Sequence, residues 1–575
     1  MLWILGLVLL VASSAYALYR RLAIKRIPGI PHLESTEWLF GDLRPMLKYY
    51  KRTKRFHPYY AELSEKFPGG FYQFNFVAWE PTLVVCDPFL IEDIMKKDPL
   101  FRRSDSFVNV FIPIIPGGSF SLQTNATWRH HRRIIGPVMS PKNLKHLSPG
   151  MVRTAEKLFI LWEMKRQMLG EPTARPVEEG CFEIMPDISL LASDIISKVA
   201  FGKGYHQLES TIAVVKSKGK SGVNEFPIER SQLGWASSLY VNSLPIESNF
   251  PRFSYFLKRL PFTSFSKAER LIHKVLNQAI IEGRQTIRSV ASSVASERNQ
   301  GCLLDMVLAK EYEFEQEQGK KAMMTVEEIR DEMATLLFAG DESVSSSIGW
   351  AIRFLTQNPH IQRKLHKDIK DALPELEERE AQYEDINSGK APYLDAIVQE
   401  VLRVAKTTMT TARTNSEETV IYGQVVPKNT EILLMLGMAG EATKSNTLID
   451  LDTLTDTEVD DEEKSSTSKK NSRFRWSDDG NLASFVPERW IDSNGKFDPN
   501  AGPSMPFGAG PRACFGQKLA VLELKMFILM LSHRYFLDSL PDSLSDPQDL
   551  MWKEAVLRRP LEIWIRPRLW SEVDI

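Results

Sequence analysis

The sequence predicts a mainly α-helical protein with small β-sheets and one N-terminal transmembrane helix. Helical periodicity dominates from residue 40 onward, and the run from Leu2 to Leu18 is apolar and uncharged. The 575 residues are 43% hydrophobic and include 30 Phe and 12 Trp, which is enough to build a sizeable core. Short runs with strand character interrupt the helical pattern at residues 71–76, 83–86, 420–426 and 561–565.

The apolar run at the amino end predicts a membrane anchor over residues 1–19. Arg20, Arg21, Lys25 and Arg26 all follow this run, and the positive-inside rule therefore places the bulk of the chain in the cytosol. Pro28 and Pro31 make residues 20–40 a basic, proline-rich hinge, and residues 41–575 are expected to form the main folded domain. A cleaved signal peptide is the alternative, but such a signal normally carries its charge before the apolar run.

Charge and cysteine content exclude some classes of partner. The formal net charge of -1 gives no electrostatic case for binding nucleic acid. The four cysteines form no CxxC pair, so they are expected to be reduced thiols. Three of them are expected to be buried as small hydrophobic residues, and Cys514 is the exception.

Residues 441–475 differ in kind from the rest of the chain. Nine acidic residues lie between Glu441 and Glu463, and Ser/Lys-rich sequence follows them. This composition predicts an exposed, disordered insertion. A solvated loop is favoured over an acidic patch that binds a partner.

A long helix is predicted from Thr325 to Asn358. Thr325 and Glu328 form a capping box at its start, and Asn358 is expected to cap the next helix ahead of Pro359. About thirty helical residues span roughly 45 Å. Halfway along, the polar stretch 340–343 contains a glycine and two carboxylates, which is costly inside a helix and indicates a working site. A helix whose centre merely reaches the surface is the alternative.

The stretch FGAGPRACFG, residues 507–516, places Cys514 in a glycine-rich bend. Such a bend lets backbone N–H groups approach the sulfur, which is expected to lower the pKa of the thiol and hold it as thiolate. A thiolate is a strongly donating ligand for haem iron, and Arg512 is suited to bind a haem propionate. A loose G-x-G-x-x-A dinucleotide pattern also fits residues 508–513, but the prolines around it exclude the strand and helix that this motif needs.

This stretch resembles the haem loop of the cytochrome P450 family, F-G-x-G-x-R-x-C-x-G, at every fixed position. The resemblance implies the cytochrome P450 fold, with Cys514 as the axial ligand of the haem iron. It covers nearly the whole chain and is closest in style to microsomal enzymes of fungal secondary metabolism. The haem-loop residues that it assigns to cofactor binding are Phe507, Gly508, Gly510, Arg512, Cys514 and Gly516.

Four further segments carry the resemblance. Glu400 and Arg403 are similar to the E-x-x-R pair, and residues 487–490 resemble the P-E-R-F/W segment, whose Arg489 would complete a buried structural triad. Trp128 and Arg132 match W-x-x-x-R, which implies contacts with a haem propionate, and Arg413 lies where the family often has another propionate-binding arginine. Without the resemblance, this basic run is a solvated helix face or a reductase-facing patch. The neighbouring His130 and His131 point in different directions on a helix and make a poor metal pair.

The polar stretch of the long helix is similar to A/G-G-x-D/E-T. The resemblance makes Glu342 the acid and Ser343 the alcohol of a catalytic pair beside bound dioxygen, with Ser in place of the commoner Thr. Two departures put the substrate in doubt. The prolines that often follow the E-x-x-R arginine are absent from residues 404–408, and the usual His-Arg-Asp run before Pro487 is missing.

The resemblance therefore implies a haem-thiolate monooxygenase that inserts one oxygen atom from dioxygen into an apolar small molecule, with a terpenoid or polyketide favoured. It implies haem b, electrons from NADPH through NADPH-cytochrome P450 reductase, cytochrome b5 as an optional second donor, and contact with membrane lipid. The expected location is the endoplasmic reticulum membrane, in single-pass form with a cytosolic catalytic domain. The alternatives are a haem-thiolate isomerase or dehydratase, a fatty-acid or xenobiotic hydroxylase, and a non-catalytic haem-binding protein.

Overall fold

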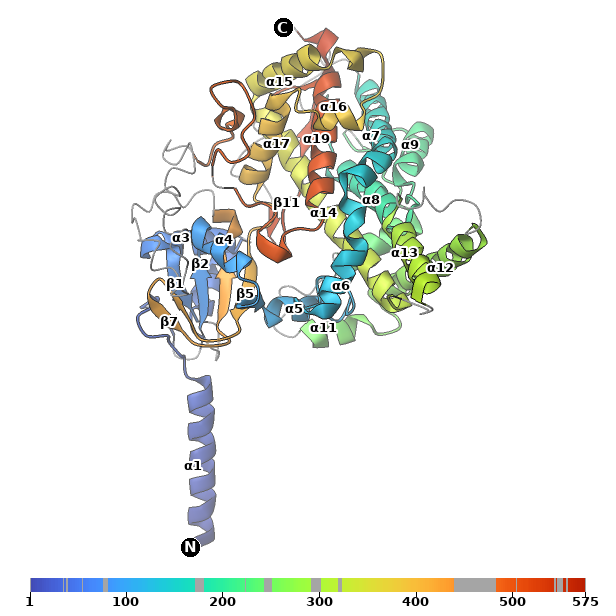
Figure 1. Ribbon diagram of the computed structural model, residues 1–575. Coiled ribbons are helices and arrows are strands. Elements are labelled where there is room, and N and C mark those ends of the chain that lie inside the picture. The colour runs from blue at the N-terminus through green and yellow to red at the C-terminus, as the bar shows by residue number, and fades with distance from the viewer. Residues whose placement is uncertain are drawn as a thin grey trace. The chain divides into compact units, whose positions relative to one another are not determined.

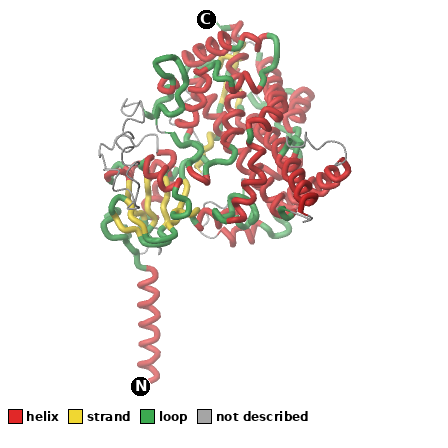
Figure 2. Tube along the Cα trace, viewed as in Figure 1, coloured by secondary structure: helices red, strands yellow, loops and turns green. Residues whose placement is uncertain are grey.

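The computed structural model describes most of the chain, in two compact units that are each treated separately below. The first unit comprises Met1–Phe107, Thr408–Ala483 and Gly502–Ala513, and the second comprises Val108–Thr407, Ser484–Ala501 and Cys514–Ile575. Figure 2 draws the remaining residues in grey. The described residues are 2–34, 36–37, 40–53, 55–75, 81–170, 180–222, 224–241, 243, 251–290, 301–318, 323–438, 482–502, 504–541, 544, 552–554 and 557–573. The predicted insertion 441–475 lies outside them.

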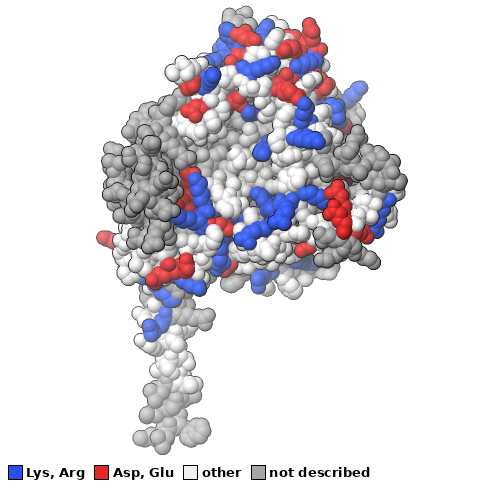
Figure 3. All heavy atoms as spheres, in the orientation of Figure 1, with Lys and Arg blue, Asp and Glu red and all other residues white. Residues whose placement is uncertain are grey.

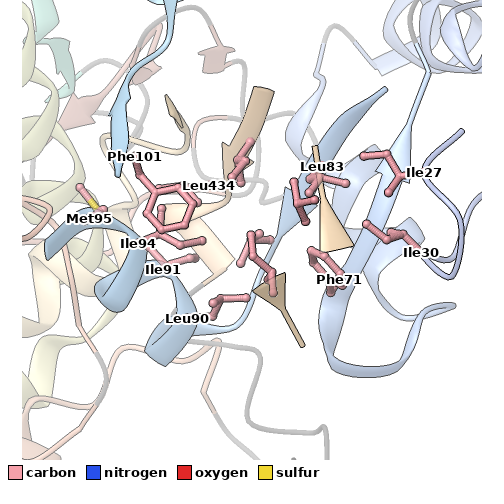
Figure 4. Close-up of a cluster of buried hydrophobic side chains, with 14 residues drawn as sticks. Ile27, Ile30, Phe71, Leu83, Leu90, Ile91, Ile94, Met95, Phe101 and Leu434 are labelled. Atoms are coloured by element: carbon pink, nitrogen blue, oxygen red, sulfur yellow. The ribbon is translucent and has the colours of Figure 1, made fainter. Parts of the chain in front are cut away.

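The first unit is built on a five-stranded sheet in the order β1-β2-β8-β5-β3. The β2 and β8 strands run parallel, with Thr82 opposite Glu431, and the other neighbouring strands are antiparallel. Figure 4 shows the apolar cluster of this unit, in which strand residues such as Leu83 and Leu434 lie with Ile91 and Ile94 of a helix. The strands are β1 (Phe71–Phe74), β2 (Thr82–Val85), β3 (Phe101–Arg103), β5 (Thr411–Asn415) and β8 (Glu431–Leu434).

The run predicted as one strand over 420–426 is a hairpin instead. Its strands are β6 (Thr419–Ile421) and β7 (Gln424–Val426), and the turn between them places Tyr422 and Gly423 at φ 51° and 70°. Two consecutive residues with positive φ reverse the chain, as in a type I′ turn. The helices of this unit are α1 (Leu2–Leu22), α2 (Leu43–Thr53), α3 (His57–Ser64) and α4 (Pro88–Lys96), and α5 (Asp105–Phe111) crosses into the second unit.

The predicted membrane anchor forms helix α1. Its side chains from Leu10 to Arg20 are exposed, including Leu10 at 65% and Tyr16 at 62%. Within the described part of the chain, no helix has both the length and the apolar character required to cross a bilayer. The transmembrane prediction is therefore not confirmed.

The second unit is helical, and the long helix α14 (Val326–Gln357) packs against α8 (Met185–Phe201), as Figure 1 shows. The capping box is confirmed: the Glu328 N–H donates to Thr325 Oγ1 at 3.1 Å, and the Thr325 N–H donates to the Glu328 carboxylate at 2.8 Å. Asn358 occupies the N-cap position of α15 (Pro359–Ala372), as predicted, but its side chain does not cap that helix and instead donates back to the Phe354 carbonyl at 2.8 Å.

The other helices of the second unit are α6 (Ala126–Ile135), α7 (Pro141–Leu169), α9 (Gln207–Lys218), α10 (Gln232–Val241), α11 (Pro251–Lys258), α12 (Ser264–Val290), α13 (Leu303–Gln318), α15 (Pro359–Ala372), α16 (Tyr383–Asn387), α17 (Pro392–Ala405) and α19 (Gln517–Arg534). Its two-stranded sheets pair β4 (Phe182–Glu183) with β12 (Trp564–Ile565), β9 (Tyr535–Leu537) with β13 (Pro567–Leu569), and β10 (Trp552–Glu554) with β11 (Arg558–Pro560). The prediction of a mainly helical chain with small sheets is confirmed.

Candidate functional site

The glycines of the cysteine bend have a packing role in the first unit. Gly508 and Gly510 have φ values of 67° and 69°, where a side chain is disfavoured. A Cβ on Gly510 would lie 2.2 Å from the Met95 carbonyl oxygen, and one on Gly508 would lie 2.7 Å from Met95 Cε. These glycines therefore let the bend approach the end of α4 closely. Phe507 precedes them and is half-buried, and Arg512 is buried in a short 3-10 helix, Gly510–Arg512.

Cys514 begins the part of the bend that belongs to the second unit. Its side chain has an exposed face, whereas Cys86, Cys181 and Cys302 are buried as predicted. Burial by the surrounding protein raises the pKa of the thiol, although the N–H groups of Gly516 and Gln517 and the charge of Arg132 act to lower it. The prediction that the bend alone holds Cys514 as thiolate is therefore wrong, because desolvation by burial raises the thiol pKa by more than those groups lower it. A metal displaces the thiol proton on binding, and the same donors then stabilise the sulfur charge.

Trp128 and Arg132 lie one turn apart on α6, which Asn125 caps by accepting from the Trp128 N–H at 2.9 Å. The Arg132 guanidinium lies 4.5 Å from the Phe515 ring centroid and 5.6 Å from that of Trp128. Arg132 makes no hydrogen bond or ion pair with any residue that the structure describes, and burial lowers its pKa. Figure 3 shows Lys and Arg side chains gathered over α6.

Arg413 lies on β5 in the first unit and is only 2% exposed. Its Nη1 donates to Thr411 Oγ1 at 3.3 Å and to the Ala412 carbonyl at 3.1 Å. Its Nε has no hydrogen-bond partner among the residues that the structure describes, and burial lowers the pKa of Arg413. A buried cation with an unpaired donor is costly unless an anion binds it. This orphaned nitrogen fits a carboxylate such as a haem propionate.

The predicted acid–alcohol pair lies on α14. Ser343 Oγ donates to the Ala339 carbonyl at 2.6 Å, and Glu342 Oε1 lies 3.5 Å from Arg559 Nη1 of β11. The helix continues through this stretch because Gly340 packs on α8, where an added Cβ would lie 2.4 Å from Ile196 Cγ1.

Sequence reasoning missed Asp341, which occupies the variable position of the motif. It is 5% exposed, and its Oδ1 has no hydrogen-bond partner among the described residues. Burial and the neighbouring charge of Glu342 raise its pKa to about 7. Asp341 and Arg559 are charged residues beside the predicted pair. The sequence places Asp341 next to Glu342, but no pattern in it predicts that Arg559 lies near the pair.

The structure brings Glu400, Arg403 and Arg489 together in a buried network. Arg403 Nε and Nη2 donate to the two carboxylate oxygens of Glu400 at 2.8 and 2.7 Å, and Arg489 Nε donates to Oε1 at 3.2 Å. The Val486 N–H and Trp490 Nε1 also donate to Glu400, at 2.9 and 2.8 Å. The side chain of Glu400 is fully buried, so five donors compensate its charge.

Comparisons with known proteins show which proteins the chain is similar to. The family model described as Cytochrome P450 matches residues 31–444 and 482–565. A cytochrome P450 monooxygenase of Pestalotiopsis microspora is 28% identical over 94% of this chain and 94% of its own. One of Fusarium sporotrichioides is 23% identical over 93% and 94% of the two chains. Secologanin synthase 1 of Catharanthus roseus is 23% identical over 82% of this chain and 77% of its own.

Proposed function

The chain belongs to the cytochrome P450 family, and from that premise we propose how its own residues serve the reaction. The protein is a haem-thiolate monooxygenase that takes haem b as cofactor and receives electrons from NADPH through a redox partner. When bound, the haem supplies the redox chemistry that activates dioxygen for insertion of one oxygen atom into a small molecule.

The cysteine of the bend and two arginines are proposed to hold the cofactor. Cys514 is proposed to bind the haem iron through its sulfur, and the N–H groups of Gly516 and Gln517 would stabilise the charge on that sulfur. Arg132 and Arg413 are proposed to bind propionates, because each is a cation whose guanidinium lacks an anionic partner among the described residues. The remaining haem contacts are proposed for Trp128, Phe507, Gly508, Gly510, Arg512 and Gly516.

Glu342 and Ser343 are proposed to hold and move protons. The Ser343 hydroxyl donates to the Ala339 carbonyl at 2.6 Å and keeps its lone pairs to accept from water. Arg559 Nη1 lies 3.5 Å from Glu342 Oε1, so the two side chains form an ion pair beside Ser343. The network of Glu400, Arg403 and Arg489 is proposed to be structural, because all three side chains satisfy one another away from solvent.

A terpenoid or polyketide is the proposed substrate class, in secondary-metabolite biosynthesis, and one plant relative carries the name secologanin synthase. We propose that α1 attaches the protein to the endoplasmic reticulum membrane, because its side chains from Leu10 to Leu18 are exposed and largely apolar. The basic surface over α6 is the proposed docking face for NADPH-cytochrome P450 reductase, with cytochrome b5 as an optional donor.

The observation that carries the proposal is the Cys514 sulfur, which has an exposed face and accepts two backbone N–H groups at the start of α19. The test is Cys514→Ala, which is expected to abolish the thiolate-type carbon monoxide difference spectrum. Cys302→Ala, at a buried thiol elsewhere, is the control and is expected to keep that spectrum. A spectrum unchanged in Cys514→Ala would identify a different ligand.

A second test addresses the isomerase alternative. Under ¹⁸O₂, a monooxygenase places the label in the product and consumes NADPH in step with product formation. A product that forms without label would overturn the monooxygenase assignment for that substrate.

A further inference from the structure

A buried histidine joins α6 to α14. His131 is 1% exposed and lies between two carboxylates of α14: its Nδ1 is 2.9 Å from Glu332 Oε1, and its Nε2 is 3.6 Å from Glu328 Oε1. Glu332 is also buried, at 3% exposure. A buried ion pair with this geometry fixes the two helices to each other, since neither charge is tolerated alone. The neighbouring His130 is half-buried, and its ring nitrogen is 3.0 Å from the Met323 carbonyl.

The same junction holds a third element, the segment of residues 112–124. Ser119 Oγ donates to the Glu332 carboxylate at 2.7 Å, and the Gly117 N–H donates to Asp331 Oδ2 at 2.9 Å. A Cβ on Gly118 would lie 2.3 Å from Thr335 Oγ1, so the backbone of the segment rests directly on α14. The Glu332 carboxylate therefore contacts both His131 and the 112–124 segment.

This segment also borders the proposed acid–alcohol pair. Phe111, just before it, and Phe120 within it pack on Phe338 of α14, with ring centroids 5.6 and 6.1 Å apart. Phe338 directly precedes Ala339, whose carbonyl accepts from Ser343. A movement of the 112–124 segment therefore changes the surroundings of Glu342 and Ser343.

We propose that His131 is a positioning residue: its imidazolium latches the 112–124 segment to α14, and loss of its proton to solvent loosens the segment and opens the approach to Glu342 and Ser343. The effect of this opening on Glu342 and Ser343 rests on the function proposed above. The latch itself rests only on the contacts of His131, Glu332 and Ser119.

The charges around His131 set the direction of the switch. Burial lowers the pKa of His131, but the hydrogen bond and charge of Glu332 and the charge of Glu328 raise it above its ordinary value overall. The other charged groups around the junction are Arg132 on α6, Arg330 and Asp331 on α14, which pair with each other, and Lys310 of α13, which donates to the carbonyls of Arg133 and Ile134. A group whose pKa is raised in the fold stabilises it fully below the ordinary pKa, and this stabilisation is lost as the pH rises through the raised value.

The test is hydrogen exchange of the 112–124 amides as a function of pH, followed by mass spectrometry of the full chain and corrected for intrinsic exchange rates. Between about pH 6 and about pH 9, protection in the wild type is expected to fall by up to about tenfold per pH unit over the titration of one proton. His131→Gln keeps hydrogen bonding without the titration and is expected to flatten this dependence. His130→Gln is the matched control and is expected to keep it. Equal pH dependence in all three proteins would overturn the proposal.

Two further measurements separate a latch from a purely structural contact. Glu332→Gln keeps an acceptor for Ser119 but removes the charge that supports the imidazolium, so the midpoint of the transition is expected to move to lower pH. The rate of carbon monoxide rebinding to the reduced holoenzyme after flash photolysis is expected to rise with pH in the wild type and to be flat in His131→Gln. If the exchange behaves as expected but rebinding does not change, the latch stands and its control of the approach is refuted. Absence of the thiolate-type spectrum from the wild-type holoenzyme would refute the proposed function without altering the exchange result.

Discussion

Removal of the Glu400 carboxylate provides a quantitative test of the buried network on α17. Glu400 is fully buried and accepts five hydrogen bonds, from Arg403 twice, Arg489, the Val486 N–H and Trp490 Nε1. Glu400→Ala leaves two buried guanidinium groups without their counter-charge, and breaking a buried pair in this way costs about 3–5 kcal/mol of unfolding free energy. Glu400→Gln keeps the shape and part of the acceptor capacity, so a smaller loss is expected.

The assay is urea unfolding of the holoenzyme, followed by tryptophan fluorescence and by haem absorbance. Both Glu400 variants are expected to lower the urea midpoint, with Ala lower than Gln. The control is Glu92→Gln, which breaks the partly exposed i,i+4 pair with Lys96 and is expected to have little effect. The reasoning is refuted if Glu400→Ala unfolds at the same midpoint as Glu92→Gln.

Three further predictions follow from individual contacts. Gly510→Ala is expected to prevent stable haem incorporation, because its Cβ would lie 2.2 Å from a backbone oxygen at a positive φ. Gly150→Ala on α7, where an added Cβ has nothing within 4 Å, is the control and is expected to retain haem; pyridine haemochromogen assays measure both. Ser343→Ala is expected to lower the ratio of product formed to NADPH consumed. The control is Ser346→Ala, which removes a hydroxyl that donates to the Arg558 carbonyl and is expected to leave this ratio unchanged. The pKa of Asp341 is raised to about 7 in the fold, so its contribution to the unfolding free energy falls as the pH rises from about 4 to about 7. Asp341→Asn is expected to remove this pH dependence from the urea midpoint. A variant with the same pH profile as the wild type would contradict the prediction.

The elements that sequence reasoning placed correctly are those encoded over short distances. The capping box of Thr325 and Glu328 needs residues three apart, and the helix start follows from it. The i,i+3 spacing of Glu400 and Arg403 likewise places both groups on one face of α17. Such patterns survive folding because the helix alone brings their members together.

What the sequence could not predict depends on groups that only the fold brings together. The contact of His131 with Glu332 joins residues 201 positions apart, and no local pattern marks it. The raised pKa of the Cys514 thiol could not be predicted from the sequence either. Desolvation by burial in the fold raises it by more than the two local N–H donors lower it. The strand prediction over 420–426 failed for a local reason, since a turn at Tyr422 and Gly423 lacked the common Asn-Gly signal.

Gly340 shows how packing and function can share one motif, and this leads to a last prediction. Its place in the polar stretch indicated a working site within the long helix, and the structure adds a packing reason, because α14 continues through Gly340 and Ile196 of α8 occupies the space that a side chain would need. Gly340→Ala is therefore expected to destabilise the fold by about 1–3 kcal/mol through overpacking, despite the better helix propensity of alanine. Ile196→Ala creates room at the same contact, so the double variant is expected to lose less than the sum of the two single losses. Strict additivity in the urea midpoints would show that Gly340 is not there to admit α8.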